Sequence, residues 1–312
     1  MRALITGAAG VIGSSLAIRL IQDKYHVIGI DNLTGGKKEH LSSILDNPKF
    51  TFYKGDIFNN SLLDRAMTGV DVVYHFAAKS DIKTVGEDDF KQNATATYRV
   101  LESMKKNKVK KIVFSSSSAV YGEPNQIPTP ENYSPLEPIS LYGASKLSSE
   151  SLIAAYSHLY EFNSWIFRFA NIVCGKNRKK GTTVITDFVD KLKKDNKNLP
   201  ILGDGRQKKS YLYVEDCIDG ILTIQNRSQD IVNVLNLGTN DSILVNEIAQ
   251  IITKAMNLKN VNLTYSGGKR GWPGDVPLML LDSSRANKLG WRPKYGSLQA
   301  VELAVSELLH LS

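Results

Sequence analysis

The stretch LITGAAGVIGS, from Leu4 to Ser14, decides the fold of this chain. Its glycines, Gly7, Gly10 and Gly13, follow a short apolar run and open a segment with helical periodicity. Glycines at this spacing let the backbone turn tightly and approach a pyrophosphate, while the helix N-terminus offers free N–H groups and a positive dipole end. The spacing alone is a weak signal, because a tight turn that caps a structural helix looks the same.

A carboxylate follows at the distance that a dinucleotide site requires. The next apolar run ends in GIDN and places Asp31 about 20 residues beyond the glycine loop. A carboxylate there accepts hydrogen bonds from the adenosine ribose and repels a 2′-phosphate. Together with the glycines, Asp31 therefore predicts a site for NAD rather than NADP.

Short apolar runs alternate with longer amphipathic segments through the first part of the chain. We expect buried strands at 3–6, 26–31, 50–56, 70–78, 111–116 and 164–169, and helices at 11–25, 62–69, 88–107 and 142–160. Repeated strand–helix alternation predicts right-handed crossovers and an α/β fold, with a doubly wound parallel sheet of Rossmann type covered by helices on both faces.

The regular alternation of apolar runs and amphipathic segments ends after about Asn171. Loops lengthen, and Gly and Pro punctuate 199–207 and 267–277, which predicts a smaller C-terminal α+β unit that covers the substrate. The segment 211–238 still has a strand–helix–strand pattern, so we expect the chain to return to the first domain. The predicted NAD-binding domain is therefore 1–170 plus about 212–238, and the predicted nucleotide-sugar-binding domain is 171–211 plus 239–312.

Composition and charge exclude several classes of partner. The 312 residues are 42% hydrophobic and 22% charged, as in an ordinary soluble globular protein. The net charge of +8 is spread out, and the densest basic runs, 104–111 and 177–181, lack interleaved aromatic residues, so we expect no nucleic-acid partner. A phosphorylated small molecule fits the charge equally well. No apolar run approaches the ~20 residues of a membrane helix, so we expect no membrane partner.

The cysteines and the start of the sequence favour the cytoplasm. Cys174 and Cys217 have no spacing for a disulfide framework or a metal site, which indicates a reducing compartment and no bound metal. The first ten residues already have the pattern of a strand and a turn, so we expect no targeting segment before the fold.

The stretch ISLYGASK holds a candidate for proton transfer. Tyr142 and Lys146 lie one helical turn apart and share a face. A phenol has an unperturbed pKa near ~10, and a nearby ammonium together with a positively charged nicotinamide would lower it. Y-x-x-x-K alone is usually structural, but the upstream FSSSSAVYG supplies hydroxyls that can relay a proton. Some of these serines cap the next segment instead, as we expect for Ser115 and Ser118.

At this point the sequence resembles the extended short-chain dehydrogenase/reductases, and among them the nucleotide-sugar epimerase/dehydratase group. The motifs TGAAGVIGS, DNL, GDI, HFAA, FSSSSAVYGE, YGASK, RFANI, GDGRQKKSYLYVED and GWPGDVP carry the resemblance in family order over nearly the whole chain. It implies a Rossmann-type fold, NAD as cofactor, a nucleotide-sugar substrate and a homodimer.

The resemblance also implies roles for individual residues. The catalytic set is Tyr142, Lys146 and Ser117, with Tyr142 as the base, Lys146 as its partner and Ser117 at the position of the family's Ser or Thr. Residues at the NAD site are Gly7, Gly10, Val11, Ile12, Gly13, Asp31, Asn32, Asp56, Ile57, Phe76, Ala77, Ala78, Asn93, Ser115, Tyr142, Lys146 and Phe169. Residues at the substrate site are Ser80, Ser117, Tyr142, Asn171, Thr183, Val184, Lys209, Arg270 and Asp275.

Several substrate positions depart from the family pattern. Lys209 stands where the family often has Arg, and Trp272 stands at the place of the diphosphate-binding Arg, with Arg270 two residues earlier. Thr183 and Val184 replace an Asn-Leu pair. We expect Lys209 and Arg270, with Asn171, to hold the diphosphate; the alternative is that both cations are solvated loop charges.

Two further positions of the substrate site have expected roles. Asp275 would accept from a ribose hydroxyl or orient Arg270. Met279 falls at the family's sugar-size gate, where its adaptable side chain would admit an N-acetyl group.

The end of the serine-rich strand favours one reaction of the group over the others. Related dehydratases and decarboxylases carry an acidic residue where this chain has Ser118 and Ala119, and reductive 3,5-epimerases carry a Cys near this point. The resemblance therefore implies NAD-dependent inversion at C4 of a UDP-hexose through a transient 4-keto sugar, interconverting UDP-glucose and UDP-galactose. The alternatives are a dehydratase or decarboxylase of the group, or a non-catalytic NAD-binding sensor.

Overall fold

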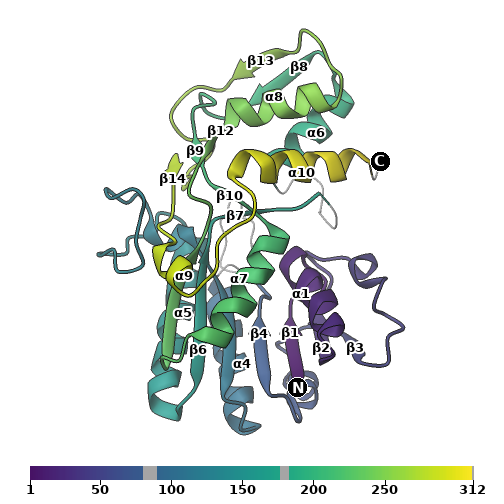
Figure 1. Ribbon diagram of the computed structural model, residues 1–312, viewed down its shortest axis with the longest axis vertical. Helices are drawn as coiled ribbons and strands as arrows, with labels where there is room; N and C mark the ends of the chain where they lie inside the picture. Colours follow the sequence, from purple (N-terminus) through teal and green to yellow (C-terminus); the bar gives the residue numbers. More distant parts are fainter. Residues whose placement is uncertain (80–89, 176–182, 311–312) are drawn as a thin grey trace.

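The computed structural model describes residues 1–79, 90–175 and 183–310, and a parallel sheet stands at its centre (Figure 1). Its seven strands run in the order β11-β6-β5-β4-β1-β2-β3 and all pair in parallel. The strands are β1 (Arg2–Thr6), β2 (His26–Asp31), β3 (Phe50–Lys54), β4 (Val72–His75), β5 (Lys111–Ser117), β6 (Asn163–Phe169) and β11 (Val232–Leu237). This order confirms the predicted doubly wound sheet.

Helices cover both faces of this sheet because successive strand residues point to opposite sides. Ala3 and Ile5 pack on the face covered by α1 (Val11–Gln22) and α7 (Val214–Arg227), whereas Leu4 packs on the other face. That other face is covered by α2 (Asn60–Met67), α4 (Ala96–Lys106) and α5 (Leu141–Tyr160). Both faces are apolar, as a parallel sheet requires.

The chain returns to the sheet after residue 210, as the sequence predicts, but by a different route. β10 (Tyr211–Tyr213) does not join the main sheet; it pairs with β7 (Asn171–Val173) in a separate two-stranded sheet. Helix α7 follows β10 directly, and β11 then pairs with β6.

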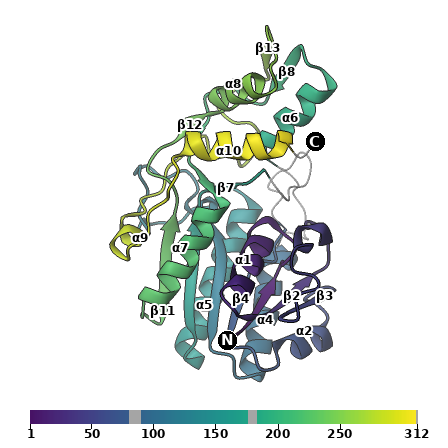
Figure 2. The ribbon, with the colours of Figure 1, turned by 45° about the vertical axis from the view of Figure 1, so that its right-hand side comes forward.

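A second hydrophobic cluster lies beyond the carboxyl edge of the sheet (Figure 2). It is built from α6 (Val184–Lys194), α8 (Val245–Ala255) and α10 (Ser297–His310), with short strands beside them. The short strands are β8 (Asn198–Ile201), β9 (Lys208–Lys209), β12 (Ile243–Leu244), β13 (Asn262–Tyr265) and β14 (Leu278–Met279). This unit faces the edge where open α/β sheets bind ligands.

The exact division into two domains stays a prediction. Most of the C-terminal elements pack in the second cluster, but Ala286 of α9 (Ser284–Lys288) and Trp291 pack with the sheet beneath α7.

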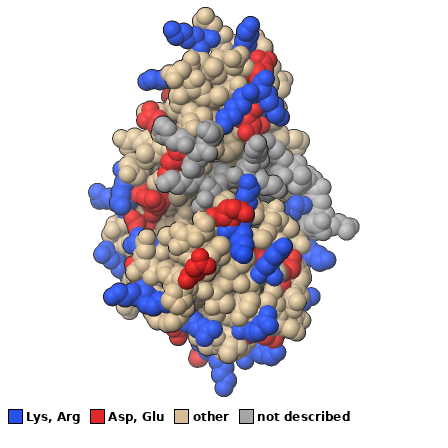
Figure 3. Space-filling view, turned by 90° about the vertical axis from the view of Figure 1, so that its right-hand side faces the viewer, with Lys and Arg blue, Asp and Glu red and all other residues tan. Residues whose placement is uncertain are grey.

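Figure 3 shows Lys and Arg dispersed over one face of the molecule, with Asp and Glu among them. In the described parts of the chain, no helix combines the length and the apolar character that crossing a membrane demands.

Candidate functional site

The glycine loop is folded so tightly that side chains are excluded from it. Gly7 has φ +72°, and a Cβ there would lie 2.7 Å from the backbone N of Ala77. A Cβ at Gly13 would lie 2.1 Å from the carbonyl oxygen of Gly7. Helix α1 begins after Gly10, which has no side chain to cap it, and its first turn carries no acidic residue. The uncapped N–H groups and the positive helix end fit the pyrophosphate of a dinucleotide.

Asp31 ties this loop to the end of β2. Its carboxylate is buried and accepts the backbone N–H of Ala9 (2.9 Å) and of Leu33 (2.7 Å), one on each oxygen. A carboxylate has about four acceptor positions, so two remain for the hydroxyls of a ribose. The arrangement therefore fits the role expected for Asp31.

The neighbouring strand ends are joined to each other. Asn32 donates from Nδ2 to Asp56 Oδ2 (2.9 Å), and Asp56 Oδ1 accepts the backbone N–H of Phe58 (2.9 Å). Asn32, Asp56 and the buried Ile57 thus lie together at the carboxyl edge, after β2 and β3.

His75 organises the end of β4, a role that the sequence reasoning missed. Its Nδ1 lies 2.7 Å from Thr6 Oγ1 and its Nε2 lies 3.0 Å from Thr97 Oγ1. Burial, with a contribution from the charge of Lys146, lowers the pKa of His75 to about 3, so the imidazole is neutral. Thr6 Oγ1 also accepts the backbone N–H of Ala77 (3.2 Å). His75 therefore connects β1 and α4 beside Phe76, Ala77 and Ala78.

Asn93 lies in a π-helical turn, Lys91–Thr95, that precedes α4. Its Oδ1 accepts the N–H of Lys79 (2.9 Å), while its Nδ2 donates to the carbonyl of Lys79 (3.2 Å) and to Ser145 Oγ (2.9 Å). Such turns are frequent at functional sites. Asn93 holds the chain after β4 against helix α5.

The first turn of α5 packs closely on the turn that follows β5. Ser140 caps α5 by accepting the N–H of Gly143 (3.0 Å), and a Cβ at Gly143 would lie 2.6 Å from the carbonyl oxygen of Ala119. This contact places Tyr142 beside Ser117. The sequence motif thus has a packing reason for its small residue after the tyrosine.

Burial is the largest influence on the pKa of the Tyr142 phenol. It raises the pKa of Tyr142 to about 12, although a hydrogen bond with the side chain of Ser117 acts in the opposite direction. The lowered phenol pKa that the sequence led us to expect is therefore not provided by the protein alone. Removal from water outweighs the neighbouring groups.

Lys146 is buried beneath the tyrosine. Its side chain is 2% exposed, and Nζ donates to the carbonyl oxygen of Ser115 (2.6 Å) and lies 5.8 Å from the centre of the Tyr142 ring. Burial lowers the pKa of Lys146 to about 7, and the charge of Glu150 acts to raise it. The predicted proximity of the ammonium and the phenol is confirmed.

The serines after Phe114 divide their roles differently from the prediction. Ser117, rather than Ser115 or Ser118, caps the 3₁₀ turn Ser118–Tyr121, because Ser117 Oγ accepts the N–H of Ala119 (3.2 Å). The backbone carbonyl of Ser115 instead receives Lys146. Ser117 can cap this turn and still face Tyr142, since its hydroxyl has one donor and two acceptor positions.

A buried ion pair lies one turn beyond Lys146. Glu150 accepts from Arg168 Nη2 (2.8 Å), both side chains are 6% exposed, and Ser116 Oγ donates to Glu150. The spacing of four residues from Lys146 places Glu150 on the same helix face. That spacing was the available signal for Glu150, whereas nothing local in the sequence indicates that Arg168 is its partner.

The substrate-side cations are both paired. Lys209 Nζ forms a buried ion pair with the carboxylate of Asp275 and lies 5.3 Å from the centre of the Trp272 ring. Asp275 also accepts the N–H of Gly271 (3.0 Å). Asp275 therefore contacts both cations: its carboxylate holds Lys209, and its backbone carbonyl accepts from Arg270 Nη1 (2.8 Å), as expected for a residue that orients Arg270.

Arg270 is held at its other end by a carboxylate that the sequence reasoning did not single out. Its Nη2 lies 2.7 Å from Glu123 Oε2, in the segment that follows the 3₁₀ turn after β5. Nearby, Asn171 Nδ2 donates to the carbonyl of Ser210, the neighbour of Lys209 in sequence (3.2 Å). Lys209 and Arg270 thus meet at Asp275, and Asn171 contacts the residue next to Lys209, so all three lie in one region.

The remaining substrate positions have structural settings of their own. Thr183 caps α6 in a capping box with Thr186, and Val184 is the first residue of that helix. Met279 is buried and packs in a cluster with Tyr121 and Ala170. Phe169, expected at the NAD site, ends β6 with its side chain in the core. Ser80 lies outside the described residues.

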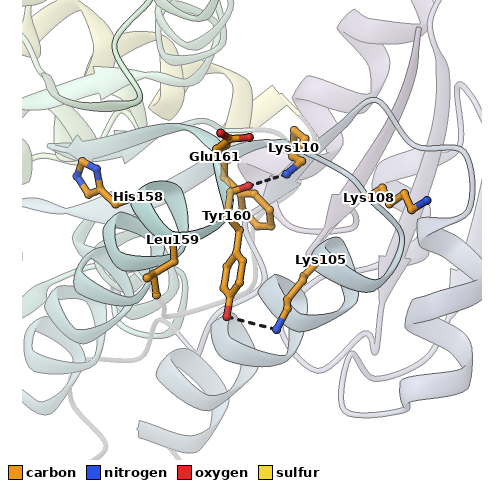
Figure 4. Close-up of a pocket in the computed structure, with 8 residues that line it drawn as sticks. Lys105, Lys108, Lys110, His158, Leu159, Tyr160 and Glu161 are labelled. Atoms are coloured by element: carbon orange, nitrogen blue, oxygen red, sulfur yellow. Dashed lines mark hydrogen bonds between the residues drawn. The ribbon is translucent and has the colours of Figure 1, made fainter.

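A surface hollow of about 310 Å³ lies away from this site (Figure 4). It is lined by Lys105, Lys108, Lys110 and residues 158–162, at the ends of α4 and α5 opposite the glycine loop. Lys105 Nζ donates to the hydroxyl of Tyr160 (3.3 Å), and Lys110 Nζ donates to its carbonyl (2.6 Å). Two of its cations are therefore engaged with Tyr160, and we assign this hollow no role in the chemistry.

Comparisons with known proteins agree with this geometry. A profile of the NAD dependent epimerase/dehydratase family matches residues 3–238. A Methanocaldococcus jannaschii protein, provisionally named UDP-glucose 4-epimerase, is 36% identical over 97% of each chain. The structure of a UDP-galactose 4-epimerase, 34% identical, superposes with a TM-score of 0.88 over 100% of this chain and 99% of that one. A dTDP-glucose 4,6-dehydratase from Streptomyces venezuelae, 26% identical, superposes at 0.90 over 99% and 97%. The chain belongs to the NAD-dependent epimerase/dehydratase family.

Proposed function

We propose that this protein is an NAD-dependent isomerase that inverts C4 of a UDP-hexose and interconverts UDP-glucose and UDP-galactose. The observation that carries the proposal is the contact of Tyr142 with Ser117 at the end of β5, beside buried Lys146 and without a carboxylate at positions 118 and 119. The relatives named for UDP-sugar 4-epimerases support the same reaction.

The cofactor site is supported by the chain's own geometry. We assign the pyrophosphate to the uncapped start of α1 and the adenosine ribose to the free acceptor positions of Asp31. The nicotinamide end would lie near Tyr142 and Lys146. When bound, NAD supplies the reversible oxidation at C4.

Tyr142 is the proposed acid and base at the C4 hydroxyl. Its phenolate takes the hydroxyl proton when the carbon is oxidised, and the phenol so formed returns the proton when the carbon is reduced. Ser117 hydrogen-bonds to the side chain of Tyr142. Because burial raises the pKa of Tyr142 to about 12, the phenolate needs positive charge at this point. Lys146 is placed to supply it, since its ammonium is fixed by the carbonyl of Ser115 beneath the ring.

The residues after Ser117 decide between epimerisation and elimination. The superposition with a dehydratase is as good as that with an epimerase, so the fold alone does not separate the reactions. A dehydratase needs a second acid and base beyond the tyrosine. Ser118 and Ala119 offer none, which favours the simpler cycle at C4.

Product analysis tests the function. The purified protein is assayed for bound dinucleotide by absorbance and mass spectrometry, and then incubated with UDP-galactose while ¹H NMR follows the sugar. We expect UDP-glucose to accumulate until the two sugars reach equilibrium. A 4-keto-6-deoxy sugar from UDP-glucose, or xylose from UDP-glucuronate, as the main product would move the protein to the dehydratases or decarboxylases. Bound NAD without turnover of any UDP-sugar would make it a sensor.

We also propose that the protein is a cytoplasmic homodimer that associates through α4 and α5. Tyr98 of α4 is 46% exposed and packs edge-to-face on the buried Tyr156 of α5 at 6.3 Å between ring centres, so an exposed aromatic ring lies where the two helices meet. Cys174 and Cys217 are buried and not joined in a disulfide, which is compatible with a reducing compartment. Light scattering should give a dimer for the wild type and a monomer for Tyr98→Glu; a monomeric wild type would refute the assembly.

A further inference from the structure

The two cations assigned to the substrate diphosphate are already neutralised. Lys209 is paired with Asp275, and Arg270 is paired with Glu123. The four formal charges of these two pairs sum to zero, so the two pairs together offer no net positive charge to a diphosphate with two negative charges. Opening one of the pairs would free a cation for the diphosphate.

The exposure of the two pairs indicates which one opens. The side chains of Lys209 and Asp275 are 16% and 3% exposed, whereas those of Arg270 and Glu123 are 41% and 44% exposed. Separating a buried pair leaves an uncompensated charge away from water and is strongly unfavourable. An exposed pair contributes little, because water and salt screen it. The Arg270–Glu123 pair is therefore the one that can open at small cost.

Contacts around each cation lead to the same choice. The ammonium of Lys209 lies over the Trp272 ring, and its partner Asp275 also accepts the N–H of Gly271, so this pair is held from several sides. Arg270 has a different arrangement: Nη1 is anchored on the carbonyl of Asp275, and Nη2 reaches Glu123. The planar guanidinium can keep the anchor and present its other edge to phosphate oxygens.

Glu123 lies between the catalytic residues and the loop that carries Arg270. It follows Gly122, which ends the 3₁₀ turn capped by Ser117, whereas Arg270 comes from the loop between β13 and β14. The ion pair thus joins the segment after this 3₁₀ turn to the loop between β13 and β14, across 147 residues of sequence. The same loop contacts the start of the catalytic helix, since a Cβ at Gly274 would lie 3.1 Å from the carbonyl of Ile139.

We propose that Glu123 competes with the substrate diphosphate for Arg270 and so sets the affinity for the nucleotide. This inference rests on the proposed function, because it takes the diphosphate as the ligand of Arg270. On binding, Arg270 leaves Glu123 for a phosphate oxygen, while Lys209 stays on Asp275 and contributes as a point charge.

The proposal makes a prediction opposite to that of a purely structural ion pair. Glu123→Gln keeps the shape of the side chain and one of its two oxygens but removes the competing charge. We expect it to bind UDP about two- to fivefold more tightly than the wild type in calorimetric titration, the range that an exposed ion pair allows. Binding of uridine, which lacks the diphosphate, should be unchanged.

A matched control and a double variant isolate the mechanism. Glu137→Gln removes an exposed carboxylate from the segment whose backbone packs on Gly122, outside the Arg270 pair, and should leave the Kd for UDP at the wild-type value. In the double variant Arg270→Ala/Glu123→Gln, the Kd for UDP should equal that of Arg270→Ala alone. Unchanged bound NAD and melting temperature show that each variant is folded.

Three results would overturn the inference: weaker or unchanged UDP binding by Glu123→Gln, equal tightening by Glu137→Gln, or tightening that persists without Arg270. These readouts measure binding and not turnover, so they separate this inference from the proposed reaction. Tighter UDP binding by Glu123→Gln in a protein that does not convert UDP-galactose would support the Glu123 assignment and refute the epimerase.

Discussion

The ammonium of Lys146 donates a 2.6 Å hydrogen bond to the backbone carbonyl of Ser115, and this bond joins the catalytic helix α5 to the catalytic strand β5. Because the acceptor is a backbone atom in the sheet, the position of the charge is set by the fold itself. Tyr142 and Ser117, which flank this bond on the helix and the strand, share a side-chain hydrogen bond of their own.

Removal of the Tyr142 phenol oxygen should reduce turnover without changing the fold or the binding of NAD. Tyr142→Phe keeps the ring and its packing, so we expect a normal melting temperature and normal bound NAD. Turnover of UDP-galactose should fall by about 10²–10⁴, the usual contribution of a positioned acid and base. Near-normal turnover in this variant would remove Tyr142 from the mechanism.

Lys146 should make the stability of the protein depend on pH. Its folded pKa, about 7, lies below the ordinary lysine value of 10.5, so between these values the unfolded chain binds the extra proton. Stability contributed by this group therefore rises as the pH rises through that window. The free energy of unfolding of the wild type minus that of Lys146→Met should increase by up to about 1.4 kcal/mol per pH unit above pH 7. Denaturant titrations at pH 7, 8 and 9 measure it, and a difference that is flat or falls with pH would contradict the assignment.

Asp31 should determine the choice of cofactor. In the wild type we expect NAD to bind at least about tenfold more tightly than NADP, since the carboxylate repels a 2′-phosphate. Asp31→Asn removes the repulsion and should narrow this ratio, while the remaining carbonyl oxygen still accepts a backbone N–H of the glycine loop. Fluorescence titration of the protein stripped of cofactor measures both ligands. Equal affinities of the wild type for NAD and NADP would exclude the proposed role.

Arg270 should contribute to the affinity for the nucleotide. Arg270→Ala should weaken UDP binding by about 1.5–3 kcal/mol, the range for a hydrogen bond to a charged group, and leave NAD binding intact. Arg292, a cation in the chain segment after α9, gives a matched control as Arg292→Ala, for which we expect no change. An unchanged Kd for UDP in Arg270→Ala would support the alternative that Arg270 is a solvated loop charge with no role in binding.

The Glu150–Arg168 pair should be sensitive to removal of one partner. Both side chains are 6% exposed, so Glu150→Ala leaves a buried guanidinium without its counter-ion. We expect a loss of about 3–5 kcal/mol in the free energy of unfolding. An exposed acidic residue such as Glu161 provides the comparison, since Glu161→Ala should cost far less. A small loss for Glu150→Ala would show that the pair adds little to stability.

Local patterns were sufficient for much of the fold. The run HVIGID became strand β2 with the predicted bounds, and the segment 142–160 became all but the first residue of helix α5. Both have strong periodicity or strong strand propensity within themselves. The strand 211–213 was also recognised, but its partner was not, because pairing with β7 depends on where the two chain segments meet in space.

The sequence by itself determined the glycine loop, Asp31 and the Tyr142–Lys146 spacing, because each depends on residues near one another in the chain. Only the tertiary structure decided the partners of the charges: Asp275 for Lys209, Glu123 for Arg270 and Arg168 for Glu150. These partners are 18 to 147 residues apart in sequence and meet only when the sheet and the C-terminal unit have packed. Burial, which raises the pKa of Tyr142 and lowers that of Lys146, has the same origin. It is a property of the packed core and not of any short stretch of sequence.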